Sequence, residues 1–142
     1  MQFRKIHEKA KTPERLTPGS AGYDLYSIEG DVLLMPGESK FFQIGIELDI
    51  NDNNLCGFIV PRSGLACLNN LILANSVGVI DSDYNKEIKV CLFNNGYEGY
   101  KVEKESRIAQ LVFMRISIPD LVEVNEFDNR SSRDGFGSTG VK

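Results

Sequence analysis

The residues with the strongest chemical signature form the run R-S-S-R-D-G-F-G-S-T-G from Arg130 to Gly140. Closely spaced glycines with Ser and Thr hydroxyls can surround phosphate oxygens, and nearby arginines supply positive charge. Most phosphate loops lead into a helix, but two residues follow Gly140 here, so we expect an arm that orders when a ligand binds. A frayed, glycine-rich terminus has a similar composition. Phe136 favours the arm, because a flexible tail gains nothing from one embedded aromatic side chain.

Four further blocks carry polar side chains that a plain β-domain does not require. They are A-G-Y-D-L at 21–25, P-R-S-G-L-A at 61–66, N-S-V-G-V-I-D-S-D-Y at 75–84 and E-S-R-I-A-Q-L at 105–111. The second block can present a guanidinium, a hydroxyl and a backbone N–H to one anion. The third places two aspartates between apolar residues and an aromatic. Each block alone also fits a structural explanation, such as a capped turn or a solvated acidic hairpin.

Composition excludes several classes of function. The 142 residues fit one domain, and the net charge of −4 argues against general nucleic-acid binding. A single histidine, His7, excludes a histidine triad or a multi-histidine metal site. The three cysteines have no C-x-x-C spacing and predict buried, reduced thiols in an intracellular protein, cytoplasmic or nuclear. No apolar run approaches the length of a membrane span.

The elements that must position these blocks are short strands. Apolar residues alternate with polar ones over 42–50 and 88–92, and further strands are predicted at 55–60 and 108–114. The last of these is almost continuously apolar, which predicts burial on both faces. The helical candidate is a short turn at 63–69. Many short strands with this spacing predict an all-β sandwich, jelly roll or barrel.

In this order and spacing, the five blocks closely resemble the five motifs of the trimeric deoxyuridine triphosphate nucleotidohydrolases (dUTPases), from about Ala21 to Gly140. The resemblance implies a jelly roll or distorted β-barrel over residues 1–129 and a C-terminal arm over residues 130–142. It also implies a homotrimer with three sites at its interfaces, each closed by the arm of another subunit. The implied reaction is Mg²⁺-dependent hydrolysis of dUTP to dUMP and pyrophosphate, which limits uracil incorporation into DNA and supplies dUMP for thymidylate synthesis.

The resemblance also implies a role for each polar residue of the first four blocks. Asp81 would orient and deprotonate the attacking water, with Asp83 as its rival, and Asp24 would hold the metal through water. The phosphate chain would be bound by Arg62, Ser63 and Gly64, and Gln110 would steady the α-phosphate or an ordered water. Uracil would pair with the hairpin formed by Asn75, Val79 and Ile80. Tyr84 would pack on the deoxyribose and exclude a 2′-hydroxyl, and Lys89 would contact the substrate from the returning strand.

In the arm, Phe136 would stack on the uracil, and the terminal phosphates would lie near Gly137, Ser138 and Thr139. Three departures from the family pattern stand out. Asn85-Lys86 replaces Arg-Gly, Glu105-Ser106 replaces Gly-Asp, and Ser131 occupies the usual position of the arm arginine. The contact with the γ-phosphate therefore falls to Arg130 or Arg133.

Other functions remain as alternatives. A dCTP deaminase of the same fold needs a proton-shuttling glutamate near the base, and the third block contains none. A dUTPase-like binding or regulatory protein without catalysis is disfavoured by the intact Asp81 and arm. A glycine-tailed RNA-binding protein is excluded by charge and by the lack of interleaved aromatic residues.

Overall fold

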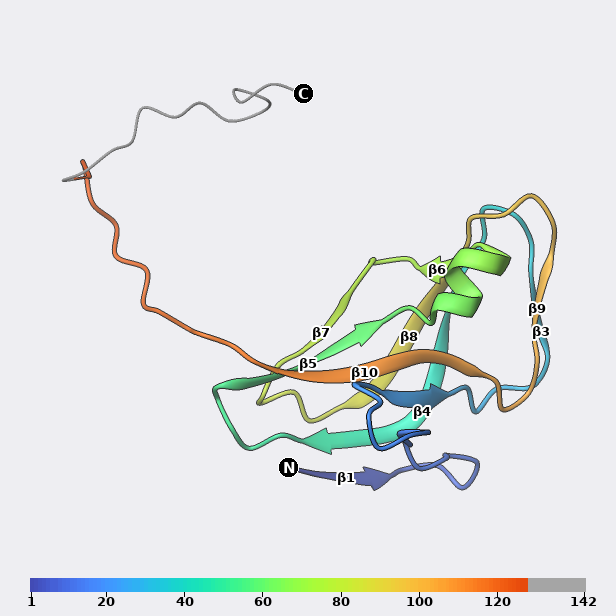
Figure 1. Cartoon of the computed structure of the whole chain (residues 1–142), viewed down its shortest axis with the longest axis horizontal. Helices are drawn as coiled ribbons and strands as arrows, with labels where there is room; N and C mark the ends of the chain where they lie inside the picture. Colours follow the sequence, from blue (N-terminus) through green and yellow to red (C-terminus); the bar gives the residue numbers. More distant parts are fainter. Residues whose placement is uncertain (128–142) are drawn as a thin grey trace.

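The computed structural model describes residues 1–127 as ten β-strands and one short π-helical turn (Figure 1). The elements are β1 (Gln2–Lys5), β2 (Tyr23–Tyr26), β3 (Val32–Leu34), β4 (Ser39–Asp49), β5 (Leu55–Val60), η1 (Gly64–Leu68), β6 (Leu71–Leu73), β7 (Gly78–Ile80), β8 (Glu87–Asn94), β9 (Tyr100–Val102) and β10 (Arg107–Arg115). Within the described residues, no helix is long and apolar enough to cross a membrane.

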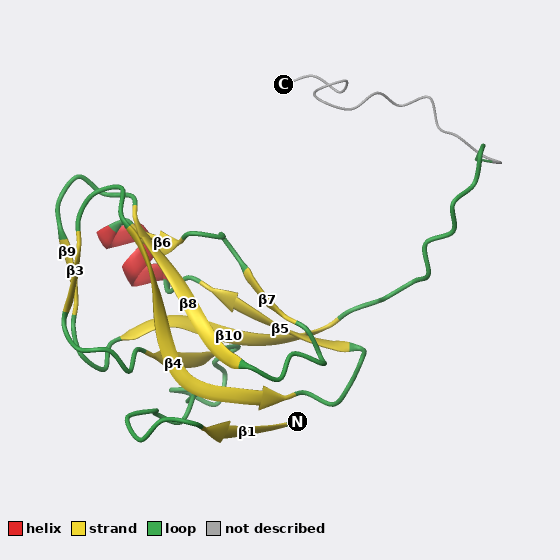
Figure 2. Cartoon of the chain, turned by 180° about the vertical axis from the view of Figure 1, so that it is seen from behind, coloured by secondary structure: helices red, strands yellow, loops and turns green. Residues whose placement is uncertain are grey.

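The strands form two four-stranded sheets and one two-stranded sheet, with antiparallel pairing throughout (Figure 2). Sheet A has the order β1-β4-β8-β6, sheet B has the order β2-β10-β5-β7, and β3 pairs with β9. The all-β prediction is confirmed. The predicted strands correspond to β4, β5, β8 and β10, and the predicted helical turn corresponds to η1.

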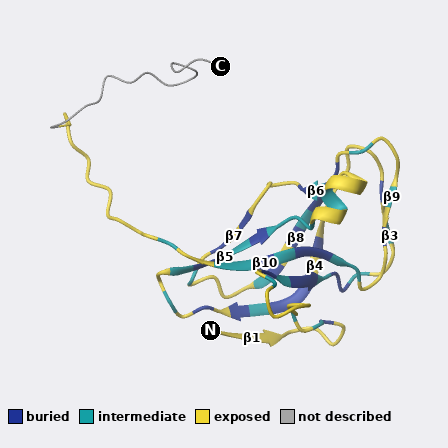
Figure 3. Cartoon of the chain, viewed as in Figure 1, coloured by how far each residue is buried: buried dark blue, intermediate teal, exposed yellow. Residues whose placement is uncertain are grey.

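The core consists of buried side chains from both four-stranded sheets, and Figure 3 shows the buried residues in dark blue. Along β4, Phe42, Ile44, Ile46 and Leu48 are all buried, as the period-two pattern predicts. The prediction that residues 108–114 are buried on both faces is correct only for the first half of this segment. A register shift between Arg107 and Ala109 accompanies the burial of two successive residues, but further along β10 the side chains alternate and Met114 is 52% exposed.

The prediction of three buried thiols is wrong for one cysteine. All three are free; Cys56 is buried and Cys91 is half-buried, but Cys67 is exposed. The physical reason is that Cys67 lies in η1, a five-residue turn that contributes no buried residue to the core.

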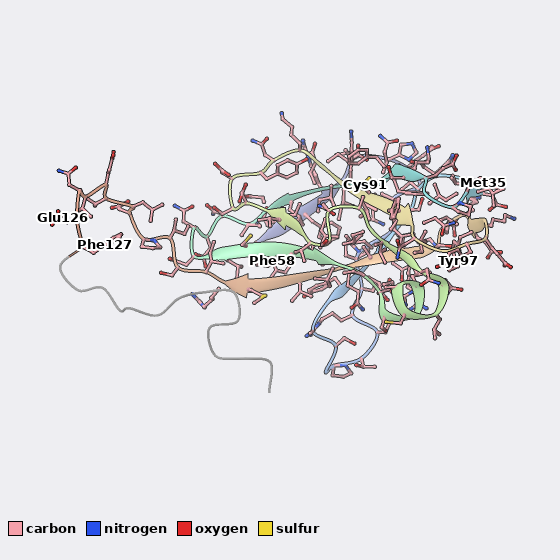
Figure 4. All side chains as sticks on the ribbon, turned by 90° about the horizontal axis from the view of Figure 1, so that it is seen from above. Met35, Phe58, Cys91, Tyr97, Glu126 and Phe127 are labelled. Atoms are coloured by element: carbon pink, nitrogen blue, oxygen red, sulfur yellow. The ribbon has the colours of Figure 1, made fainter. Side chains whose placement is uncertain are left out.

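After β10, the chain from Ile116 to Phe127 runs away from the sheets (Figure 1). The Ile116 N–H donates to the Asn54 carbonyl at 2.9 Å, and beyond it Leu121 is 96% exposed. Glu126 and Phe127 lie at the opposite end of the described chain from Met35 and Tyr97 (Figure 4). The predicted boundary at residue 129 and the arm over residues 130–142 lie outside the described residues.

Two adjacent leucines of β3 test the assignment of the core. Leu34 is 3% exposed and Leu33 is 60% exposed. Replacing Leu34 with Ala should therefore lower the free energy of unfolding by about 2–4 kcal/mol, the usual cost of a leucine-sized deletion in a core. Urea denaturation followed by tyrosine fluorescence measures this loss. Leu33→Ala is the matched control, and an equal loss in both variants would contradict the assignment.

Candidate active site

Asp24 is at the centre of an ion cluster on sheet B. Its side chain is 3% exposed, and three side chains donate to its carboxylate. Arg62 Nε lies 3.2 Å from Oδ1, Arg107 Nη1 lies 3.2 Å from Oδ2, and Gln110 Nε2 lies 3.3 Å from Oδ1. These four residues are called the Asp24 cluster. The cluster brings three residues of the predicted site together, and two guanidinium groups around one carboxylate leave it with excess positive charge.

Strand pairing explains why these residues meet. Asp24 of β2 and Val60 of β5 both pair with Gln110 of β10, so the three form one row across sheet B. Pro61 follows the end of β5, and the next residue, Arg62, turns back toward the row, where its Nη1 also donates to the Arg107 carbonyl at 3.3 Å. A cavity of about 410 Å³ borders the cluster and is lined by both arginines.

Arg107 belongs to the Asp24 cluster, although the sequence interpretation gave it no role. Its position three residues before Gln110 was the available signal, but the block alone resembles an ordinary strand start. The structure pairs it with a buried carboxylate, which an ordinary strand residue does not require.

Asp24 has little capacity left for a metal. Both carboxylate oxygens already accept hydrogen bonds, and the side chain is almost fully covered. Within residues 1–127, no group of three or more His, Cys, Asp or Glu side chains is arranged to hold a metal ion. The water-mediated Mg²⁺ contact of Asp24 thus stays a prediction, and the geometry favours a role in orienting Arg62 and Arg107.

Ser63 and Gly64 follow Arg62 on the surface. Ser63 occupies the N-cap position of η1, yet its hydroxyl makes no capping hydrogen bond and the residue is exposed. At Gly64, an added Cβ would meet nothing within 4 Å. The hydroxyl and the backbone beside it are therefore open to a ligand next to the Asp24 cluster.

Asp81 begins a tight turn at the end of β7, called here the Asp81 turn (residues 81–84). The Tyr84 N–H donates to the Asp81 carbonyl at 3.1 Å, and the Tyr84 hydroxyl donates to the Glu87 carbonyl at 2.9 Å. Asp81 is exposed, whereas Ile80 before it is buried. The turn therefore presents a carboxylate to solvent from a fixed backbone.

The hairpin before Asp81 exposes the backbone of an edge strand. β7 is the last strand of sheet B, so one side of its backbone is unpaired within the sheet. Asn75 precedes β7 in a turn that the Val77 N–H closes on the Asn75 carbonyl at 2.6 Å. Val79 is 57% exposed and pairs with Phe58 of β5. The free backbone edge has the alternating donors and acceptors that the edge of a base requires.

Within one chain, the structure does not bring the Asp81 turn to the Asp24 cluster. Ile80 pairs with Gly57, so Asp81 lies level with Cys56, while the row of Asp24 and Gln110 meets β5 at Val60, four residues further along the strand. Four residues of strand span roughly 13 Å. Lys89 lies away from both groups, on β8 of sheet A opposite Gln43. The strand pairing therefore places Asp81 and the Asp24 cluster at different levels of sheet B within one chain.

The turn around Glu105 shows how the structure accommodates one departure from the family pattern. The Ser106 N–H donates to the Glu103 carbonyl at 3.2 Å, and Glu105 in this turn has φ of 60°. Glycine is the usual residue with such a φ. The Lys11 ammonium lies 2.7 Å from the Glu105 carboxylate, and this hydrogen bond lowers the pKa of Glu105.

Two aspartates in ion pairs test the role of the Asp24 cluster. Asp24→Asn leaves two partly buried guanidinium groups without their counter-ion and should cost about 2–3 kcal/mol of unfolding free energy. It should also raise KM for dUTP, because Arg62 loses its orientation. Asp31→Asn is the control, since its pair with Lys101 at 2.6 Å is half-exposed. Urea titration measures the unfolding free energy, and steady-state kinetics measure KM. Equal changes in the two variants would contradict the role of the Asp24 cluster.

Comparison with known proteins agrees with this geometry. The dUTPase family model matches residues 8–140. A deoxyuridine 5′-triphosphate nucleotidohydrolase of Tolumonas auensis is 40% identical over 138 residues, which cover 96% of this chain and 91% of the relative. The vaccinia virus (strain Copenhagen) protein with the same name is 42% identical over 144 residues, covering 100% of this chain and 94% of the relative.

A solved structure shares the fold of this chain. It is a mutant dUTPase of Staphylococcus bacteriophage 80alpha with dUpNHpp, which matches with a TM-score of 0.87 and 28% identity. The match covers 99% of this chain and 98% of that chain. The chain therefore belongs to the dUTPase family, and the reaction that it catalyses is the hydrolysis of dUTP.

Proposed function

We propose that the site for dUTP hydrolysis is assembled between subunits of a homotrimer. The Asp81 turn and the β7 hairpin of one subunit would face the Asp24 cluster and Ser63 of a neighbour. The observation that carries this proposal is the separation between the two groups, which lie at levels four residues, or roughly 13 Å, apart along β5 of one chain. A base for the attacking water and the ligands of the same phosphate must lie within hydrogen-bond reach of it.

An apolar row on sheet B supports such an interface. Val112, Phe58 and Val79 are paired across β10, β5 and β7, so their side chains share one face (Figure 4 labels Phe58). None of the three is buried in the single chain, and Val79 is 57% exposed. The row lies between the row of Gln110 and the level of Asp81. A neighbour that covers it would bring its own polar groups to both sides.

The proposed chemistry needs a water in line with the α-phosphorus and the pyrophosphate leaving group. The Asp81 carboxylate would accept a hydrogen bond from that water and take its proton as the oxygen attacks. The new bond forms between the water oxygen and the α-phosphorus, while the bond to the bridging oxygen breaks and pyrophosphate leaves. The exposure of Asp81 and the fixed backbone of its turn support this role.

The triphosphate would be held mainly by charge. Arg62, with its guanidinium directed by Asp24, would bind the phosphate oxygens together with the Ser63 hydroxyl and the Gly64 N–H, and Gln110 would contact the α-phosphate. A Mg²⁺ ion would arrive with the nucleotide, because this ion is commonly bound by substrate phosphates and waters with few protein ligands. It would supply charge neutralisation.

Selection of the nucleoside would depend on the β7 hairpin. Its free backbone edge, around Val79, and the Asn75 amide would pair with the polar edge of uracil, and cytosine would leave these groups unpaired. The Tyr84 ring would pack on the deoxyribose, and its hydroxyl bond to Glu87 supports a fixed ring position. The arm residues Arg130, Arg133, Phe136, Gly137, Ser138 and Thr139 would close the site.

The role of Asp81 predicts a separation of kcat from binding. Asp81→Asn should lower kcat by about 10²–10⁴-fold, because the general base is lost, while the Kd for dUpNHpp stays within a few fold. Asp83→Asn, two residues later in the same turn, is the matched control and should retain most of the rate. Phosphate release in a coupled pyrophosphatase assay gives kcat. The roles are reversed if Asp83→Asn is the inactive variant.

Assembly of the site between subunits predicts complementation. Asp81→Asn and Ser63→Ala should each be nearly inactive alone. When they are co-expressed, random trimers place an intact Asp81 beside an intact Ser63 in about a quarter of the sites. Pyrophosphate release per site should therefore recover to about a quarter of the unmodified rate. A mixture as inactive as its parents would show that one chain supplies both residues.

A further inference from the structure

The buried thiol of Cys56 lies directly beside the start of the Asp81 turn. Cys56 is 2% exposed and is the residue of β5 level with Asp81, because Gly57 pairs with Ile80. Its Sγ donates to the Ile80 carbonyl at 3.2 Å and lies 3.6 Å from the Gly57 carbonyl. The bond to Ile80 is made where β7 ends.

This bond and the turn together fix the backbone on both sides of Asp81. The Ile80 carbonyl belongs to the peptide unit that precedes the Asp81 Cα, and the Asp81 carbonyl belongs to the unit that follows it. The first accepts from the Cys56 thiol and the second accepts from the Tyr84 N–H at 3.1 Å. Because each peptide unit is planar, fixing both units fixes the direction in which the Asp81 side chain leaves the backbone.

A second contact holds the same turn from the other side. The Ser82 hydroxyl donates to Asn53 Oδ1 at 3.2 Å. Asn53 lies in the β4–β5 loop, whose own shape is fixed by the Asp52 carboxylate, which accepts from the Asn54 N–H at 2.9 Å. The turn is thus attached both to the buried Cys56 thiol of β5, through Ile80, and to the surface loop, through Ser82.

We propose that Cys56 is a positioning residue for Asp81, and that its S–H bond to the Ile80 carbonyl holds the catalytic carboxylate in its productive direction. The inference rests on the proposed role of Asp81 as the base. Displacement of a reacting group by about 1 Å can cost as much as 10²-fold in rate, so a single backbone contact at this position is sufficient to matter.

The thiol keeps the proton that this bond requires. Burial raises the pKa of Cys56 above its ordinary value, and the Asp81 carboxylate raises it further, against a smaller opposing effect of a backbone hydrogen bond with Ile80. The proton is therefore retained at neutral pH, below the ordinary pKa of a thiol. Cys91, on β8, is the natural comparison, because burial raises its pKa as well.

The test compares Cys56→Ala, Cys56→Ser and Cys91→Ala in the full-length protein. Cys56→Ala should lower kcat about 10-fold and leave KM for dUTP within about 2-fold, because the base is misdirected while the binding groups are untouched. Cys56→Ser restores a donor and should recover kcat to within about 3-fold of the original value. Cys91→Ala removes a half-buried thiol on another strand and should leave kcat unchanged. Should Cys56→Ala fail to fold, Asn53→Ala removes the surface attachment and should itself lower kcat.

Two further measurements separate this inference from the role of Asp81. In an Asp81→Asn background, Cys56→Ala should have no further effect on the residual rate, since its effect passes through the missing carboxylate. Hydrogen exchange of the Tyr84 amide should be faster in Cys56→Ala than in Cys91→Ala. Unchanged kcat in Cys56→Ala, with Asp81→Asn inactive, overturns the positioning role. An active Asp81→Asn overturns the catalytic role of Asp81 instead, and the exchange rate alone then decides whether Cys56 holds the turn.

Discussion

The register of β5 against β7 and β10 is the constraint on which the site depends. Side chains alternate along each strand, so a slip by one residue would turn every polar residue of sheet B to the other face. Two glycines make the register compatible with a packed core. A Cβ on Gly57 would lie 3.2 Å from the Ile80 Cβ, and one on Gly78 would lie 3.1 Å from the Ile59 Cβ. The glycine that precedes Val79 thus gives the two strands room to approach closely.

The same register places a carboxylate where burial is expensive. Removing Asp24 from water costs several kcal/mol, and the two arginines offset that cost without making the pair more stable than apolar side chains of similar volume. A gain in folding stability therefore explains the Asp24 cluster poorly. The orientation of Arg62 explains the Asp24 cluster better. The Arg62 side chain is 26% exposed, and it is fixed at Nε by Asp24 and at Nη1 by the Arg107 carbonyl. The buried Asp24 carboxylate thus orients the partly exposed Arg62 guanidinium.

The sequence was sufficient for the fold class and for the positions of β4, β5, β8 and β10, because alternation in β4 and β8 reflects burial on one face. The family resemblance also assigned Arg62 and Gln110 to one site, and the structure brings both of them to Asp24. Arg107 and Cys56 could not be found in this way. Each contacts a residue more than 20 positions away in the chain, and the local pattern, including the spacing of Arg107 from Gln110, does not reveal that contact. The exposure of Cys67 was missed because composition does not reveal how shallow η1 is.

The proposed assembly between subunits gives one explanation for two features of the single chain. A face with an exposed apolar row is unfavourable in water, and a base remote from its phosphate ligands is ineffective. The row of Val112, Phe58 and Val79 lies between those two groups, on the strands that separate them. In the proposed homotrimer, covering the row with a neighbouring subunit would remove apolar surface from water and would supply the other half of the site in the same contact. The hydrophobic effect that drives such an assembly would then also bring the proposed base to its substrate, so that catalysis would depend on the oligomer and not on the fold of one chain.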